Sequence, residues 1–194
     1  MIIISIGVDC GMAMFLNANN LRHLSFPFDW NVTYTGVSKC LDDNFKHFTE
    51  PLNNNRINQY DVFFYHDFEK DECMDQDKEK YIRRCQRLLD LLQTTDEEII
   101  FCRKGHARHH HYEQNGKYAD QLNDLDDAEK LDVILQQRFP SLKYKIVVIL
   151  VCGHCFHSLE TYKSKSDNID VYNIATPEAD SGVFEDLCRS IFII

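Results

Sequence analysis

Apolar runs alternate with amphipathic stretches along most of this chain. Apolar, β-branched runs predict strands at residues 2–8, 62–65, 98–102, 144–151 and 169–174. Apolar positions at helical spacing predict helices at residues 12–18, 35–44, 78–92, 126–139 and 183–192. This alternation predicts an α/β fold, a single-domain sandwich with a mostly parallel central sheet flanked by helices.

Residues 103–122 interrupt the pattern. The segment is rich in His, Gly and Tyr and has no periodicity, so we interpret it as an inserted loop or an irregular hairpin. In parallel sheets, sites gather at the carboxyl ends of the strands. We therefore expect Cys10, His66, Arg103 and Cys152 to lie along one edge of the sheet.

Composition and charge limit the kinds of protein that this chain can be. The chain has 194 residues, 44% of them hydrophobic, which favours one domain over residues 1–194. Its formal charge of −10 argues against nucleic acid as a partner. No apolar run is long enough to span a bilayer and no signal peptide is visible, so we expect a soluble, cytoplasmic protein without membrane contact. The eight scattered cysteines are typical of reduced thiols.

Cys10 stands where the first predicted strand gives way to the first predicted helix. A thiol at such a junction meets the partial positive charge and unpaired N–H groups of the helix, which favour a thiolate and can stabilise an oxyanion. A cysteine nucleophile needs a base, and His66 is the leading candidate. Asp29 or Asp9 is at least as plausible as Asp67 for orienting that base. The alternative is a buried thiol that fills the junction.

Four motifs together carry a resemblance to a known family. They are Gly7-Val8-Asp9-Cys10, Ser25-Phe26-Pro27-Phe28-Asp29-Trp30, Phe64-Tyr65-His66-Asp67-Phe68 and Lys80-Tyr81-Ile82-Arg83-Arg84. In order and spacing they resemble the putative papain-like cysteine peptidase family, over the first half of the chain above all. The resemblance implies a thiol-dependent activity, and we assign Cys10, His66 and Asp29 as the candidate catalytic residues.

Aromatic and basic residues also suggest ligand contacts. Trp30 beside Asp29 can form one wall of a pocket, although the same segment can simply anchor a loop. Arginines on the helix over residues 78–92, and Arg103 at a strand end, can bind a carboxylate or phosphate, unless nearby acids pair with them. We assign ligand contacts to Trp30, Asp67, Arg84 and Arg103.

Two His- and Cys-rich segments, residues 106–111 and 152–157, raise the question of metal. Their crowded spacing differs from the paired, well-separated ligands of structural zinc sites, so we expect no bound metal and no other cofactor. The tetrapeptide Cys152-Gly153-His154-Cys155 matches that of disulfide isomerases, but too little chain follows it for a thioredoxin-like fold.

The sequence thus predicts a thiol-dependent hydrolase or transferase acting on a small-molecule, peptide or glycan substrate. The alternative is a module that binds an anionic ligand or modifies carbohydrate without cysteine catalysis. It would use Arg103, Asp29 and Trp30.

Overall fold

The computed structural model describes residues 1–33, 36–50, 52–105, 113–114, 117–118, 124–151, 163–174 and 181–192. Its strands are β1 (Ile2–Ser5), β2 (Val32–Thr33), β3 (Val62–Phe63), β4 (Ile99–Gly105), β5 (Glu113–Gln114), β6 (Lys117–Tyr118), β7 (Tyr144–Val151) and β8 (Ile169–Ile174). Its helices are α1 (Gly11–Ala18), α2 (Val37–Asp42), the 3₁₀ turn η1 (Asp71–Cys73), α3 (Met74–Thr94), α4 (Asp124–Arg138) and α5 (Ser181–Phe192).

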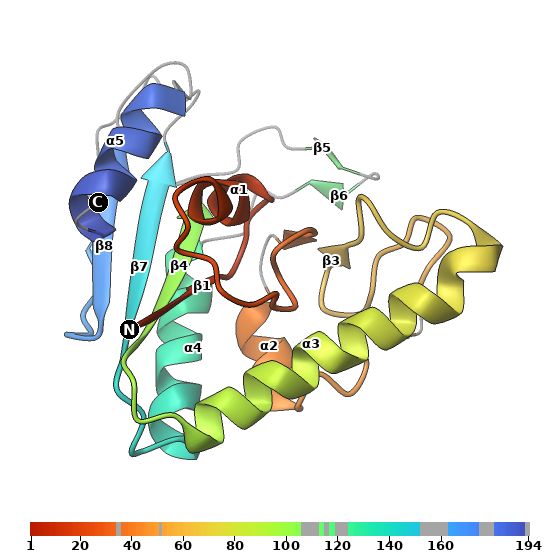
Figure 1. Ribbon diagram of the computed structural model, residues 1–194, viewed down its shortest axis with the longest axis horizontal. Coiled ribbons are helices and arrows are strands. Elements are labelled where there is room, and N and C mark those ends of the chain that lie inside the picture. Colours follow the sequence, from red (N-terminus) through yellow and green to blue (C-terminus); the bar gives the residue numbers. More distant parts are fainter. Residues whose placement is uncertain are drawn as a thin grey trace.

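A four-stranded sheet in the order β1-β4-β7-β8 forms the centre of the fold (Figure 1). Each neighbouring pair is parallel, with Ile2 opposite Ile99, Ile99 opposite Tyr144, and Ile146 opposite Ile169. The helices between these strands supply the crossovers that parallel pairing requires. The predicted α/β fold with a mostly parallel sheet is confirmed.

The two faces of the sheet carry separate cores. In β4, Phe101 packs with residues of α2, α3 and α4, whereas Cys102 packs with residues of α1 and α5. This follows from the alternation of side chains along a strand. Figure 1 shows the same arrangement, with α5 beside β8 and α3 on the far side of the molecule. The central sheet, including the end of β1, therefore lies between two helical layers.

The predicted element bounds are accurate for β7 and β8 and differ elsewhere by a few residues. The loop predicted from residue 103 starts too early, because β4 continues to Gly105 opposite Leu150 of β7. Within residues 103–122, β5 and β6 pair antiparallel, as in the irregular hairpin considered above. Only these four residues are described between Gly105 and Asp124.

The predicted strand at residues 62–65 is β3, and it does not belong to the central sheet. It pairs antiparallel with β2, Val32 lying opposite Phe63. The expectation that His66 follows a strand of the same sheet as Cys10 is therefore wrong. A two-residue strand carries too little pattern to show which sheet it joins.

Among the helices described, none combines the length and the apolar character needed to cross a bilayer.

Candidate functional site

Cys10 is the residue immediately before α1, in the loop that leaves β1. Two backbone hydrogen bonds hold this loop: the Val8 N–H donates to the Lys104 carbonyl at 2.7 Å, and the Thr33 N–H donates to the Val8 carbonyl at 2.8 Å. The Cys10 residue is half-buried. The structure thus places this thiol where the sequence predicts it, at the carboxyl end of β1 and the start of a helix.

Lys104 is a charged neighbour of Cys10 that the sequence did not predict. Its Nζ lies 3.8 Å from Asp9 Oδ2 and 5.1 Å from the centre of the Phe184 ring. A methyl group added at Gly11 would lie 3.3 Å from this Nζ, so the ammonium sits against the first turn of α1. The missed signal is that β4 continues past Cys102 to Gly105, which puts Lys104, two residues after Cys102, on the same face of the sheet as Cys102 and α1.

Asp9 acts on the pKa of Cys10 in the opposite direction to Lys104. Its Oδ1 accepts a hydrogen bond of 2.7 Å from the Gly11 N–H. Burial and the Asp9 charge raise the pKa of the Cys10 thiol, while the Cys10 backbone N–H and the Lys104 ammonium act to lower it. The pKa of Cys10 is raised overall, so the thiol is protonated in the resting protein and any nucleophilic role needs a base.

Four other described cysteines are buried: Cys40, Cys85, Cys102 and Cys188. Burial raises the pKa of each thiol, and for Cys40 and Cys102 the rise is large. Such thiols pack as small apolar groups and react poorly. Of the six described cysteines, only Cys10 and Cys73 are half-buried, and Cys73 lies beside the start of α3, away from the sheet.

His66 lies on the loop after β3 and is exposed. Its ring packs edge to face against Tyr65, with centroids 4.8 Å apart. Among the described residues no hydrogen bond joins Cys10 to His66. The pairing of this thiol with this base stays a prediction.

Asp29 is almost completely enclosed, with 2% of its side chain exposed. Its Oδ2 accepts hydrogen bonds from Arg22 Nη2 at 2.7 Å and from the Phe26 N–H at 2.8 Å. Burial raises the pKa of Asp29, and the Phe26 and Arg22 bonds offset part of that rise. The carboxylate thus fixes the turn that carries Trp30, whose ring lies 5.5 Å from the Arg22 guanidinium. Its described partners include neither Cys10 nor His66.

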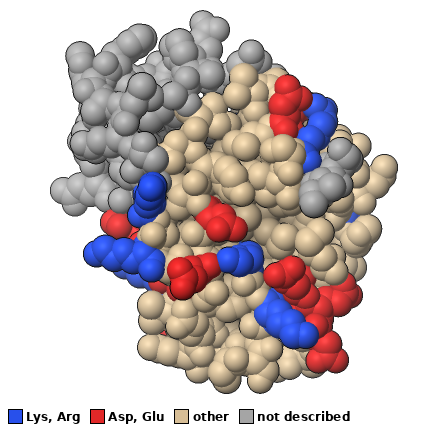
Figure 2. Space-filling model, turned by 90° about the vertical axis from the view of Figure 1, so that its left-hand side faces the viewer, with Lys and Arg blue, Asp and Glu red and all other residues tan. Residues whose placement is uncertain are grey.

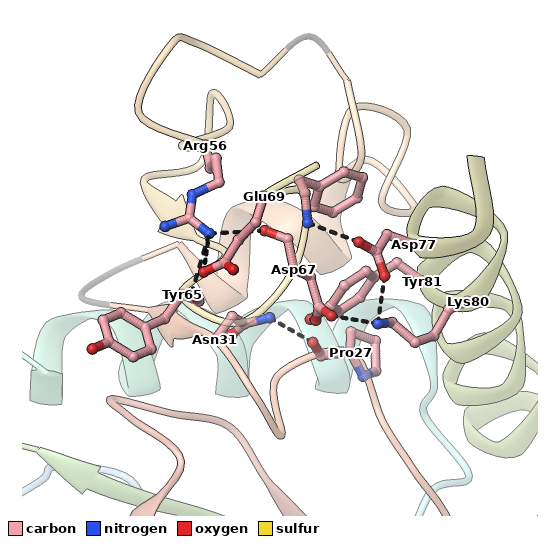
Figure 3. A network of polar contacts seen from close by, with 10 residues as sticks. Pro27, Asn31, Arg56, Tyr65, Asp67, Glu69, Asp77, Lys80 and Tyr81 are labelled. Atoms are coloured by element: carbon pink, nitrogen blue, oxygen red, sulfur yellow. Dashed lines mark hydrogen bonds and ion pairs between the residues drawn. The ribbon is translucent and has the colours of Figure 1, made fainter. Parts of the chain in front are cut away.

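Asp67 belongs to a polar network on the side of α3 (Figure 3). It accepts hydrogen bonds from Lys80 Nζ and, at 2.7 Å, from the Tyr81 hydroxyl. Burial raises the pKa of Asp67, but the bonds from Lys80 and Tyr81 outweigh it and leave the pKa below its usual range. The Arg84 charge acts to lower the pKa of both Asp29 and Asp67. Of the predicted site residues, Arg84 therefore lies within electrostatic range of both Asp29 and Asp67.

Arg103 is buried, with 1% of its surface exposed. Its Nη1 donates to the Ile6 carbonyl at 2.7 Å, its Nη2 donates to the Thr33 carbonyl at 2.8 Å, and its Nε donates to Asp124. These bonds join the end of β1 to β2 and to α4. Arg103 therefore links parts of the fold, and its predicted contact with a ligand stays a prediction.

The two His- and Cys-rich segments, residues 106–111 and 152–157, lie outside the described residues. Cys152, expected at the same sheet edge as Cys10, lies there too. In the described part of the chain, no three His, Cys, Asp or Glu side chains form a group that could hold a metal ion.

The family model described as putative papain-like cysteine peptidase matches residues 1–57 and 55–154 of the chain. Comparisons with curated proteins and with solved structures found no match. The matched segments include β1, Cys10, Asp29 and Asp67, together with the hydrogen-bond donors described above for these two carboxylates. They span well over half of the sequence, and the chain belongs to the putative papain-like cysteine peptidase family.

Proposed function

We propose that this protein is a thiol-dependent hydrolase or transferase in which Cys10 is the nucleophile. One observation carries the proposal: Cys10 is half-buried at the first turn of α1 with the Lys104 ammonium against the same turn. A cation and a helix N-terminus both favour a thiolate over a thiol. The family membership agrees with this assignment.

The reaction begins with loss of the Cys10 proton to a base, because the raised pKa keeps the resting thiol protonated. The thiolate attacks the acyl carbon of the substrate, the leaving group departs with a proton, and a thioester forms on Cys10. Water or a second acceptor then attacks the thioester and releases the thiol. These steps need no oxidant and no metal ion.

The first turn of α1 supplies N–H groups without partners inside the helix, which suits a developing oxyanion. Asp9 already accepts the Gly11 N–H. We therefore propose that the N–H groups of Met12 and Ala13 donate hydrogen bonds to the oxyanion, and that the Lys104 ammonium stabilises its negative charge. His66 is the proposed base, and this role requires its exposed loop to bring the ring within hydrogen-bond reach of Cys10 Sγ.

The test is acylation by p-nitrophenyl acetate, an activated ester. Intact and peptide mass spectrometry should find an acetyl thioester on Cys10, and the Cys10→Ala variant should lose it. The Cys73→Ala variant is the matched control, since Cys73 is the other half-buried cysteine described. An acetyl group that maps to Cys73 or to lysines, and survives in Cys10→Ala, would remove Cys10 from the mechanism.

A second function, the binding of an anionic ligand without cysteine catalysis, is favoured by a different observation. Two arginines of α3, Arg84 and Arg87, have no carboxylate within ion-pair distance among the described residues.

A further inference from the structure

Helix α3 carries five cations: Lys78, which pairs with Glu50, and Lys80, Arg83, Arg84 and Arg87. Lys80 pairs with Asp67 and Asp77, and Arg83 lies 3.8 Å from Glu79. Arg84 and Arg87 are half-buried and form no such pair within the described ranges. The usual arrangement, in which helix arginines pair with neighbouring acids, therefore holds for Arg83 and fails for these two.

Arg84 carries the clearest sign of an unmet requirement. Its Nη1 is buried, and no described group accepts a hydrogen bond from it. The guanidinium lies 5.3 Å from the centre of the Tyr81 ring. This cation–π contact stabilises the positive charge, but the ring does not replace a hydrogen-bond acceptor for the buried N–H. A buried donor without an acceptor costs about 1–3 kcal/mol, so such groups call for a partner.

The carboxylates nearest to Arg84 are already engaged. Asp29 accepts from Arg22 and from the Phe26 N–H, and Asp67 accepts from Lys80 and Tyr81. Arg22 pairs with Asp29, and Lys80 is shared between Asp67 and Asp77. The Arg84 charge acts on Asp29 and Asp67, but within the described ranges Arg84 forms no ion pair with either of them.

Arg87 brings a second guanidinium to the same segment. Its Nη1 donates to the Ser25 carbonyl at 2.6 Å, while Arg22 Nη2 donates to the Ser25 hydroxyl at 2.8 Å. Two guanidiniums, those of Arg22 and Arg87, thus bond to the turn that ends in the half-buried Trp30, and the Arg84 charge acts on Asp29 of the same turn. Arg84 and Arg87 are three residues apart on α3 and so project from the same side of the helix.

One face of the molecule shows how charge is distributed over part of the surface (Figure 2). On the face that Figure 2 shows, among the residues that are described, Lys and Arg lie interspersed with Asp and Glu and form no broad basic area. Anion binding must then come from a local group of donors. Planar guanidiniums suit this role because they offer paired N–H groups to carboxylate or phosphate oxygens.

We propose that Arg84 and Arg87 form a binding site for the oxyanion of a small ligand, a carboxylate or a phosphate, beside Trp30. Arg22 and Asp29 hold the turn in place, and the Tyr81 ring supports the Arg84 guanidinium. The site is independent of cysteine chemistry and stands or falls apart from the proposed role of Cys10.

The test measures the unfolding temperature in sodium phosphate, and separately in sodium acetate, against sodium chloride of equal ionic strength. Phosphate or acetate should raise the unfolding temperature of the wild type, because a ligand that binds only the folded state stabilises it. The Arg84→Gln and Arg87→Gln variants should lose the shift, with a Kd raised about tenfold or more. Arg83→Gln, one position away on the exposed side of α3, should keep it.

The two anions distinguish the source of the oxyanion: a shift with phosphate alone assigns a phosphate ligand, and a shift with acetate assigns a carboxylate. The Cys10→Ala variant should show the wild-type shift, which separates this site from catalysis. If Arg84→Gln does not fold, as judged by circular dichroism, Arg87→Gln decides the matter. An equal shift in the wild type and in Arg87→Gln, or no shift with either anion, would overturn the proposal.

Discussion

Replacing Arg103 by Met should be among the most destabilising single changes in this protein. Arg103 is 1% exposed, and its guanidinium reaches Asp124, which is 0% exposed. It also donates to the carbonyls of Ile6 and Thr33 at 2.7 and 2.8 Å. Methionine preserves the length of the stem and removes every one of these donors, so the change isolates the hydrogen bonds and the charge.

The magnitude follows from the buried carboxylate. Removing one partner of a buried ion pair typically costs about 3–5 kcal/mol, because the remaining charge stays in a poorly solvated place. The carbonyls of Ile6 and Thr33 also lose their donor, at about 1–3 kcal/mol each when no other group replaces it. These costs are not additive, and we expect a loss of about 3–5 kcal/mol in the free energy of unfolding. In a chain of this size that lowers the unfolding temperature by roughly 6–20 °C.

Urea unfolding measures this loss, with the fluorescence of Trp30 and far-UV circular dichroism as the two probes, since Trp30 is the only tryptophan. The double variant Arg103→Met/Asp124→Leu removes both charges and should recover part of the loss, as buried ion pairs replaced by apolar groups often do. A loss below about 1 kcal/mol in Arg103→Met would refute the structural role of this arginine. It would also return Arg103 to the candidates for ligand binding.

The remaining predictions concern charge and capping. At a pH below the pKa of the Cys10 thiol, Asp9→Asn should speed the alkylation of Cys10 and Lys104→Gln should slow it, each by up to about fivefold. The reason is that the Asp9 charge raises this pKa and the Lys104 charge lowers it. Opposite or absent effects would contradict the electrostatics of the site. The lowered pKa of Asp67 means that its carboxylate stabilises the fold above its unfolded pKa of about 3.9, a contribution lost as the pH falls through the lower folded pKa. Urea unfolding should therefore show Asp67→Asn less stable than the wild type near neutral pH, with the gap closing below about pH 4, and a constant gap would count against the Lys80 and Tyr81 bonds. Asp127→Ala should cost about 1–2 kcal/mol, since Asp127 accepts bonds from the Val37 N–H and the Ser38 hydroxyl at the start of α2, whereas the exposed Asp126→Ala should be nearly neutral in the same unfolding assay.

The sequence was sufficient to predict the strands of the central sheet, and the bounds of β7 and β8 agree with the structure to the residue. Strand β7 lies between β4 and β8 and carries the continuous apolar run typical of a central parallel strand, whereas β8, at the edge of the sheet, mixes apolar and polar residues. The end of β4 was not predicted, because Arg103 and Lys104 look polar. Burial of Arg103 against Asp124 becomes visible only when the two residues, 21 apart in the chain, are brought together.

The candidate site was predicted in part for a similar reason. Cys10 follows a clear strand, so its place at the start of α1 could be predicted. The small β2–β3 sheet consists of two-residue strands, too short to carry a period, and it determines where His66 lies. The partners of the α3 arginines depend on which loop packs against which turn of the helix, and only the structure shows that Arg83 is paired and Arg84 is not.

The most direct test of the central claim is the rate of p-nitrophenolate release from p-nitrophenyl acetate by the wild type, Cys10→Ala and Cys73→Ala. If Cys10 is the nucleophile, Cys10→Ala should fall to the rate of the uncatalysed reaction, while Cys73→Ala should keep the wild-type rate. A folded Cys10→Ala protein that releases p-nitrophenolate as fast as the wild type would contradict the account.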